Sequence, residues 1–219
     1  HQRTQLRKQA LLERGLTAQQ VAAASAPSAS CIVVNAGAGS GKTLTLAERV
    51  VWLKSEGVRL QDILVCTFTR ASAGELSHRV GTRLGTKEPL PWCGTTHALS
   101  LQLLGGTAAL AERGVRLLTE EEYLEEDEVL ELMAPESLAQ LSAAELLTRV
   151  QRCIEEQHGS PDVCALTDAW LERLRETGRW DFSMLLQATL GEPARRTFRH
   201  LLVDEAQDLS ALQLGWLAH

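Results

Sequence analysis

Short apolar segments alternate with stretches of helical periodicity along much of the chain. Four segments have the length and composition of strands: 32–35, 63–68, 91–95 and 199–204. The stretches 43–55 and 71–84 repeat apolar residues at helical spacing. Strands rich in Ile, Leu and Val that alternate with helices are typical of a parallel sheet covered by helices on both faces. The pattern therefore predicts an α/β fold.

The stretch from Gly105 to about Trp180 differs, because its pattern is helical throughout and contains no strand-like run. Gly159-Ser160-Pro161 and Gly178 mark loops within it. We predict an all-helical insertion at residues 105–180. The α/β domain around it would consist of residues 1–104 and 181–219.

Three helix starts carry the capping-box pattern, in which a hydroxyl residue and a Gln or Glu three positions later satisfy two backbone N–H groups. The pairs are Thr17 with Gln20, Thr119 with Glu122, and Ser142 with Glu145. Apolar residues flank each pair at the positions of a hydrophobic staple. We expect a helix to begin at each.

Composition limits the class of protein. The chain has 219 residues and is 44% hydrophobic, enough for a packed core in one domain or two small ones. No stretch approaches the ~18 consecutive apolar residues of a membrane span, and the amino end lacks the apolar core of a signal peptide. We expect a soluble, cytoplasmic protein without a membrane partner. The five cysteines form no C-x-x-C pair and suggest reduced, mostly buried thiols.

The formal net charge of −6 argues against nucleic-acid binding through a bulk positive field, although a local groove remains compatible with it. Much of the acidity is local, since eight of the twelve residues at 120–131 are Asp or Glu. This acidic run is most simply a solvated helix face. An interaction surface is the alternative.

The strongest chemical signal is the segment Ala36-Gly37-Ala38-Gly39-Ser40-Gly41-Lys42-Thr43. It follows an apolar run and opens a helical pattern, which is the context of a phosphate-binding P-loop. Backbone N–H groups of such a loop surround phosphate oxygens at the positive end of the helix. Lys42 would reach the β and γ phosphates, and the Thr43 hydroxyl would bind Mg²⁺. The alternative is a glycine-rich turn, and Ala36 does depart from the common pattern, which begins with Gly.

A pair of carboxylates, Asp204 and Glu205, ends the apolar run at 201–203. In a parallel sheet, the carboxyl end of this strand would lie beside the P-loop. Asp204 would then hold Mg²⁺, and Glu205 would polarise the water that attacks the γ-phosphate. The alternative is an acidic helix start that suits the helix dipole.

The segment Asp204-Glu205-Ala206-Gln207-Asp208 resembles motif II of the UvrD/Rep-type superfamily 1 DNA helicases. Further segments agree with that family in order and spacing: 16–20 with its Q motif, 36–43 with motif I, 67–71 with motif Ia and 94–97 with motif Ib. Residues 181–186 resemble the segment that returns from the family's helical subdomain to the ATPase core. The resemblance covers nearly the whole chain. It implies a RecA-like P-loop NTPase that uses ATP and Mg²⁺.

The resemblance also assigns roles outside the P-loop. Gln20 would contact the edge of the adenine base. The alternative role for Gln20 is that of the capping-box partner of Thr17. Gln207 would also belong to the nucleotide site. Five residues would contact single-stranded DNA: Phe68, Thr69, Arg70, Thr95 and His97. A core position is the alternative for Phe68, and a solvated loop position is the alternative for Arg70 and His97.

Two positions depart from the family. Thr96 stands where motif Ib usually has an aromatic residue, and Leu44 follows motif I where an Arg is common. The family's later motifs are absent as well, including the motif III strand that the resemblance places between the P-loop strand and the motif II strand. We therefore expect a fragment that lacks the carboxyl-terminal motor domain and hydrolyses ATP poorly by itself.

Together these features indicate the amino-terminal ATPase domain of an ATP-dependent DNA helicase that moves along single-stranded DNA, 3′ to 5′ if it follows the family. Two alternatives stay open: the motor part of a helicase-nuclease for DNA break processing, and a nucleotide-gated binding module without unwinding activity. A P-loop small-molecule kinase is disfavoured, because the acidic pair with Gln207 suits activation of water.

Overall fold

The computed structural model describes residues 2–37, 39–119, 122, 130–192 and 196–219. The chain divides into two compact units. The first comprises residues 1–95 and 197–207, and the second comprises residues 96–196 and 208–219. Within the described ranges, no helix has both the length and the apolar character needed to cross a membrane.

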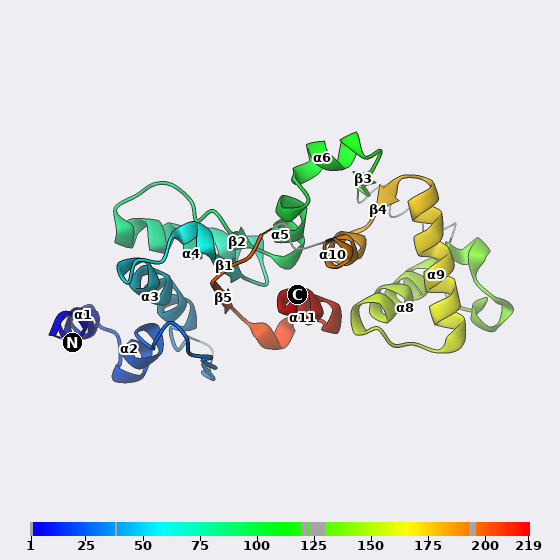
Figure 1. Ribbon diagram of the computed structural model, residues 1–219. Coiled ribbons are helices and arrows are strands. Elements are labelled where there is room, and N and C mark those ends of the chain that lie inside the picture. Colours follow the sequence, from blue (N-terminus) through cyan, green and yellow to red (C-terminus); the bar gives the residue numbers. More distant parts are fainter. Residues whose placement is uncertain (1, 38, 120–121, 123–129, 193–195) are drawn as a thin grey trace. The chain divides into compact units, whose positions relative to one another are not determined.

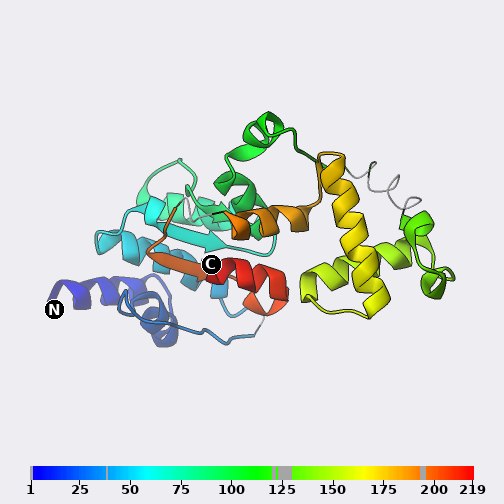
Figure 2. The same ribbon diagram turned by 45° about the vertical axis from the view of Figure 1, so that its right-hand side comes forward.

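The first unit is an α/β unit. Its elements are α1 (Gln2–Glu13), α2 (Ala18–Ala24), α3 (Lys42–Ser55), η1 (Leu60–Asp62), β1 (Ile63–Cys66), α4 (Arg70–Leu84), β2 (Cys93–Gly94) and β5 (His200–Val203). The strands form a parallel sheet in the order β2-β1-β5. Figure 2 shows β1 and β5 side by side, with Ile63 opposite His200 and Cys66 opposite Val203.

The core of this unit lies between the sheet and its helices. Ala47, Val50 and Leu53 of α3 pack against Leu76 and Val80 of α4. Ile63 and Val65 of β1 and Leu202 of β5 complete the same cluster. Helix α3 lies beside both α2 and α4 (Figure 1). The sheet therefore supports the helix that begins at Lys42.

The second unit is mostly helical. It contains α5 (Thr96–Leu103), α6 (Gly106–Glu112), β3 (Arg116–Leu117), η2 (Glu136–Leu138), α8 (Ala143–Glu156), α9 (Pro161–Glu176), β4 (Arg179–Trp180), α10 (Phe182–Gly191) and α11 (Ala211–Ala218), while η3 (Ala206–Asp208) joins β5 to α11. Helices α8 and α9 pack together, and Trp170 of α9 is fully buried.

Two sequence predictions need correction. Residues 31–37 carry no assigned strand, and Val33 is 88% exposed, so the strand predicted at 32–35 is not formed. An apolar run forms a strand only where a partner edge supplies its hydrogen bonds. The stretch 105–180 is also not all-helical, because β3 and β4 pair in parallel near its two ends. The compact units divide at 95/96, 196/197 and 207/208. The sequence pattern suggested divisions at 104/105 and 180/181, with residues 208–219 in the α/β domain.

All three predicted capping-box pairs are present. Thr17 with Gln20 begins α2, and Ser142 with Glu145 begins α8. Thr119 and Glu122 exchange their two bonds at 3.0 and 3.3 Å. The structure adds a fourth box, Ser210 with Gln213 at α11, whose pattern was readable in the sequence. Most of the acidic run at 120–131 lies outside the described residues. All five cysteines are free thiols.

Candidate functional site

The loop at 36–43 turns sharply into α3. Gly39 and Gly41 have φ angles of +72° and +84°, a region that favours glycine. Gly41 is the N-cap of α3, and the Ser40 hydroxyl donates to the Gly37 carbonyl at 2.7 Å. Ala38 lies outside the described residues. The loop therefore presents main-chain N–H groups at the positive end of a 14-residue helix.

The acidic pair lies directly beside this loop. Lys42 Nζ is 3.1 Å from Glu205 Oε1, and it also donates to the Ala36 carbonyl at 3.3 Å. Thr43 Oγ1 donates to Asp204 Oδ2 at 3.3 Å. The pairing of β5 with β1 brings this about, because it ends in a bond from the Asp204 N–H to the Cys66 carbonyl at 2.9 Å. Residues 161 positions apart in the sequence thus meet at one point.

The two carboxylates have opposite electrostatic environments. Burial, followed by the neighbouring charge of Glu205, raises the pKa of Asp204 above its ordinary value. The Gln207 amide, followed by Lys42, lowers the pKa of Glu205. Gln207 Nε2 donates to Glu205 Oε2 at 2.6 Å. Glu205 also has a φ of +51°, an uncommon conformation for a residue with a side chain, and such residues cluster at functional sites.

Gln20 already uses both ends of its amide. Its Oε1 accepts from the Thr17 N–H at 2.8 Å, which is the capping-box bond. Its Nε2 donates to the Ser40 carbonyl at 2.9 Å, inside the P-loop. The capping role is therefore present, and the same side chain reaches the loop. Each end of the amide keeps further capacity, a second N–H on Nε2 and a second lone pair on Oε1, with which it could contact an adenine.

The oxygen atoms at this point suit magnesium. Thr43 supplies a hydroxyl and Asp204 a carboxylate that is 8% exposed. Among the described residues, no group of three or more His, Cys, Asp or Glu is arranged around a common point. Mg²⁺ is commonly held by one or two carboxylates with substrate phosphates and water, so two protein oxygens fit this ion better than a closed protein cage would.

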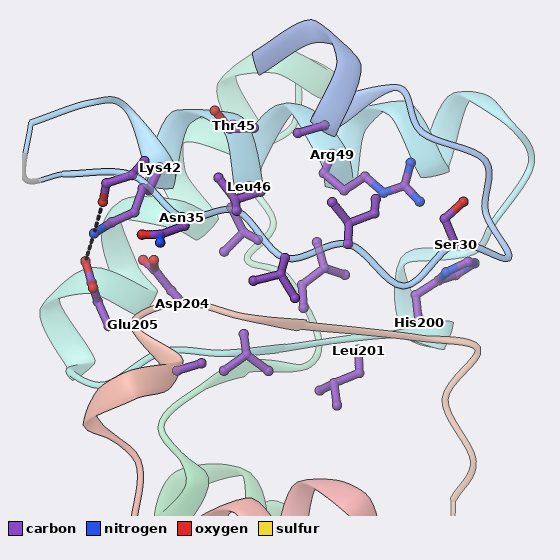
Figure 3. A pocket seen from close by; sticks show the side chains of 18 of the residues that line it. Ser30, Asn35, Lys42, Thr45, Leu46, Arg49, His200, Leu201, Asp204 and Glu205 are labelled. Atoms are coloured by element: carbon purple, nitrogen blue, oxygen red, sulfur yellow. Dashed lines mark hydrogen bonds and ion pairs between the residues drawn. The ribbon is translucent and has the colours of Figure 1, made fainter. Parts of the chain in front are cut away.

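A cavity of about 670 Å³ extends from this point between residues 30–36 and β5 (Figure 3). Lys42, Asp204 and Glu205 lie at one end of it, and Arg49 and His200 lie at the other. Its walls include exposed apolar side chains, among them Ile32, Val33, Val34 and Leu201. Arg49 belongs to none of the sequence motifs, although its position among the apolar residues of the helix predicted at 43–55 was readable from the sequence.

The DNA-contact candidates are divided between the two units. Phe68, Thr69, Arg70 and Thr95 belong to the first unit and His97 to the second. Phe68 is 52% exposed, so the core alternative is wrong for it. Thr69 is the N-cap of α4, accepting from the Ser72 N–H at 3.0 Å, and Arg70 is exposed.

His97 is a poor candidate for a cationic contact. Burial lowers its pKa, so the ring is neutral at neutral pH. Its ring lies 5.4 Å from that of Phe182, centroid to centroid. The adjacent departure, Thr96, is buried and accepts a hydrogen bond from Gln213 Nε2 at 3.1 Å. The other departure, Leu44, packs against the apolar cluster around Trp52.

Comparison with known proteins bears on this geometry. The family model described as "UvrD/REP helicase N-terminal domain" matches residues 16–219. The "ATP-dependent DNA helicase UvrD1" of Mycobacterium tuberculosis is 31% identical over 215 residues, covering 84% of this chain and 28% of the relative. "DNA helicase II" of Escherichia coli is 29% identical over 225 residues, covering 92% of this chain and 31% of the relative.

A shorter match joins the chain to one subunit of an ATP-dependent helicase/nuclease of Heliobacterium modesticaldum, at 49% identity over 59 residues. That match covers 27% of this chain and 4% of the relative. The chain spans less than a third of the length of each of these relatives. Because the family model covers almost all of the sequence, the chain belongs to the UvrD/REP helicase family and corresponds to its N-terminal domain.

Proposed function

We propose that this chain is the ATP-binding, RecA-like part of an ATP-dependent DNA helicase. One observation carries the proposal: Lys42 and Thr43 meet Glu205 and Asp204 at 3.1 and 3.3 Å. A cation and a hydroxyl at a helix N-terminus, opposed by two carboxylates, form a complementary set for a magnesium triphosphate.

Each residue has a distinct role in this proposal. Main-chain N–H groups of the loop, from Ala36 to Gly41, bind phosphate oxygens. Lys42 leaves Glu205 and binds the β and γ phosphates. Thr43 and Asp204 hold Mg²⁺, which neutralises phosphate charge when bound.

Glu205 is the residue that activates water. Its ion pair with Lys42 is one of the causes that lower its pKa. When Lys42 turns to the phosphates, that stabilisation of the carboxylate is removed, and Glu205 becomes a stronger base for the attacking water. Gln207 holds the other carboxylate oxygen and orients it. Phosphate binding thus makes the Glu205 carboxylate a stronger base.

The same proposal extends to the complete protein. The relatives are about three times as long as this chain, so we infer that the full protein carries a second motor domain. The arginines of that domain would stabilise transition-state charge, an effect of ~10³ to 10⁵ in rate in other NTPases. A later strand would fill the opening between residues 32–34 and β5, where apolar side chains are exposed. Single-stranded DNA would contact Phe68, Thr69, Arg70 and Thr95 of the first unit, with movement from 3′ to 5′.

A helicase-nuclease motor is the second candidate, favoured by the 49% identity with the helicase/nuclease relative over 59 residues. A nucleotide-gated module without unwinding remains the third. Strand displacement by the full-length protein separates the alternatives. We expect ATP-dependent unwinding that Glu205→Gln abolishes. Tight ATP binding without unwinding would favour the gated module, and DNA cleavage by the same polypeptide would favour the helicase-nuclease.

The chain by itself provides a complementary test. We expect it to bind Mg²⁺–ATP, to hydrolyse it very slowly and to show no stimulation by single-stranded DNA. Robust DNA-stimulated hydrolysis by these 219 residues would contradict the proposal.

A further inference from the structure

Arg49 is a buried cation on the helix that begins with Lys42. It lies seven residues beyond Lys42 in α3, which is about two helical turns, so the two side chains share one face of the helix. Arg49 is 8% exposed. Figure 3 shows Lys42 and Arg49 at opposite ends of the cavity. The proposed phosphate chemistry accounts for Lys42 and leaves Arg49 without a role.

The hydrogen bonds of Arg49 converge on the end of α2. Its Nη1 donates to the carbonyls of Ala24, at 3.2 Å, and of Ala26. Its Nη2 donates to the Pro27 carbonyl at 3.2 Å. Ala24 is the last residue of α2, and carbonyls at a helix C-terminus lack partners within the helix. A planar guanidinium directs its donors in fixed directions, so it fixes orientation as well as supplying charge.

Helix α2 is also the helix that carries Gln20. It has seven residues, too few to be stable without tertiary contacts. Val21 and Ala24 pack with Trp52 of α3, and Gln20 bonds to the P-loop carbonyl of Ser40. The apolar contact is non-directional. Two directional contacts therefore orient α2: Gln20 at its start and Arg49 at its end.

Nucleotide binding would add to the contacts of Gln20 and leave those of Arg49 as they are. A Gln20 amide that reads a base can use its second N–H and its second lone pair while it keeps its bonds to Ser40 and Thr17. The three bonds of Arg49 lie away from the loop and need not change. Burial lowers the pKa of Arg49, because taking a charged group out of water is costly. The main-chain carbonyls offset that cost.

We propose that Arg49 is a positioning residue for base recognition, holding the C-terminus of α2 on α3 so that Gln20 faces the base of a nucleotide bound at the P-loop. The inference rests on the proposed function, since it requires Gln20 to contact the base of a bound nucleotide. Arg49 itself touches neither the phosphates nor the base.

The test compares the affinities of the 219-residue chain for ATP, GTP and inorganic triphosphate, with magnesium, by calorimetry. Arg49→Met keeps the apolar stem and removes the three hydrogen bonds, and Arg49→Lys keeps the charge. We expect Arg49→Met to weaken ATP binding by about three- to tenfold, the usual effect of losing hydrogen bonds to one recognised group. Triphosphate affinity should change by less than about twofold, and the preference for ATP over GTP should fall. Arg79→Met, which removes an exposed arginine of α4, is the matched control.

A second background shows whether Arg49 acts through Gln20. In Gln20→Ala, the further change Arg49→Met should alter ATP affinity by less than about twofold, because residues that act as a unit are not additive. Equal losses for ATP and triphosphate, or the same loss in both backgrounds, would overturn the inference and leave a general structural role. If Arg49→Met does not fold, as judged by circular dichroism, Arg49→Lys decides by the same criteria.

Binding by the unsubstituted chain distinguishes failure of the Arg49 role from failure of the phosphate site. An unsubstituted chain that binds triphosphate but does not distinguish ATP from GTP would overturn the role of Arg49 and leave the phosphate site intact. An unsubstituted chain that binds neither ATP nor triphosphate would overturn the proposed function, and this inference with it.

Discussion

Replacing Lys42 by Ala tests the phosphate site with little damage to the fold. In the structure, Lys42 Nζ contacts Glu205 Oε1 at 3.1 Å and the Ala36 carbonyl at 3.3 Å. The Lys42 side chain is 26% exposed and that of Glu205 is 36% exposed. An ion pair so open to solvent contributes little to stability. Alanine also has the highest helix propensity, which suits the first turn of α3.

The effect on nucleotide binding should be much larger. A hydrogen bond between a charged donor and a charged acceptor contributes about 1.5 to 3 kcal/mol. Since about 1.4 kcal/mol corresponds to a factor of ten, Lys42→Ala should weaken ATP binding by roughly 10- to 150-fold. Loss of the competing contact with Glu205 reduces this slightly, because the wild-type lysine must leave that carboxylate to bind phosphate.

Calorimetric titration with Mg²⁺–ATP measures this loss, and thermal unfolding of the nucleotide-free chain measures the stability. Lys54→Ala is the matched control, because Lys54 lies in the last turn of the same helix and is exposed. We expect similar melting temperatures for all three proteins and weakened binding in Lys42→Ala alone. Unchanged ATP affinity in a folded Lys42→Ala chain would refute the phosphate role of this residue.

Three further predictions concern the same site. Glu205→Gln in the full-length protein should change ATP affinity by no more than a few-fold. It should lower the hydrolysis rate by about 10²- to 10⁴-fold, the usual contribution of a general base. Unchanged turnover in a phosphate-release assay would show that Glu205 is not the base. Because the pKa of Asp204 is raised, Mg²⁺-dependent ATP affinity should fall on acidification at a higher pH than an ordinary aspartate would give. The charge of Asp204 costs stability above its folded pKa, and this cost decreases as the pH falls through that pKa and is gone below the pKa of the unfolded chain. Calorimetric titrations across pH check the change in ATP affinity, and melting curves across pH check the change in stability. In Asp204→Asn, the pH dependence that comes from Asp204 should be absent, and the pH dependence that comes from the nucleotide should remain. Gly41→Ala should destabilise the chain by about 1 to 2 kcal/mol in denaturant unfolding and weaken ATP binding, because φ is +84° and the new Cβ would lie 2.7 Å from Gln20 Nε2. Gly74→Ala, at an open helical position, should instead stabilise the chain by about 0.4 to 1 kcal/mol and leave ATP binding unchanged.

The sequence predicted the meeting of the two motifs because each is a local pattern with a fixed structural context. Gly41-Lys42-Thr43 requires a helix start, and Asp204-Glu205 requires a strand end. The α/β pattern then leaves one edge of the sheet where both can lie. The capping boxes were readable for a similar reason, since their bonds span only three residues.

Features that depend on distant partners could not be predicted in this way. The run Ile32 to Val34 has the composition of a strand, but composition does not show whether a hydrogen-bonding edge is available. The β3–β4 pair joins segments about 60 residues apart that are only two residues long, too short for a periodic signal. The bonds from Arg49 to the end of α2 depend on how two helices pack, which the sequence of neither helix contains.

A crystal structure of the chain with Mg²⁺ and a non-hydrolysable ATP analogue would show whether the two motifs form one nucleotide site. We expect one magnesium ion between the Thr43 hydroxyl and the Asp204 carboxylate, with Lys42 on the phosphates and released from Glu205. A nucleotide bound elsewhere, or an ion that contacts neither Thr43 nor Asp204 while the Lys42–Glu205 pair stays closed, would contradict it.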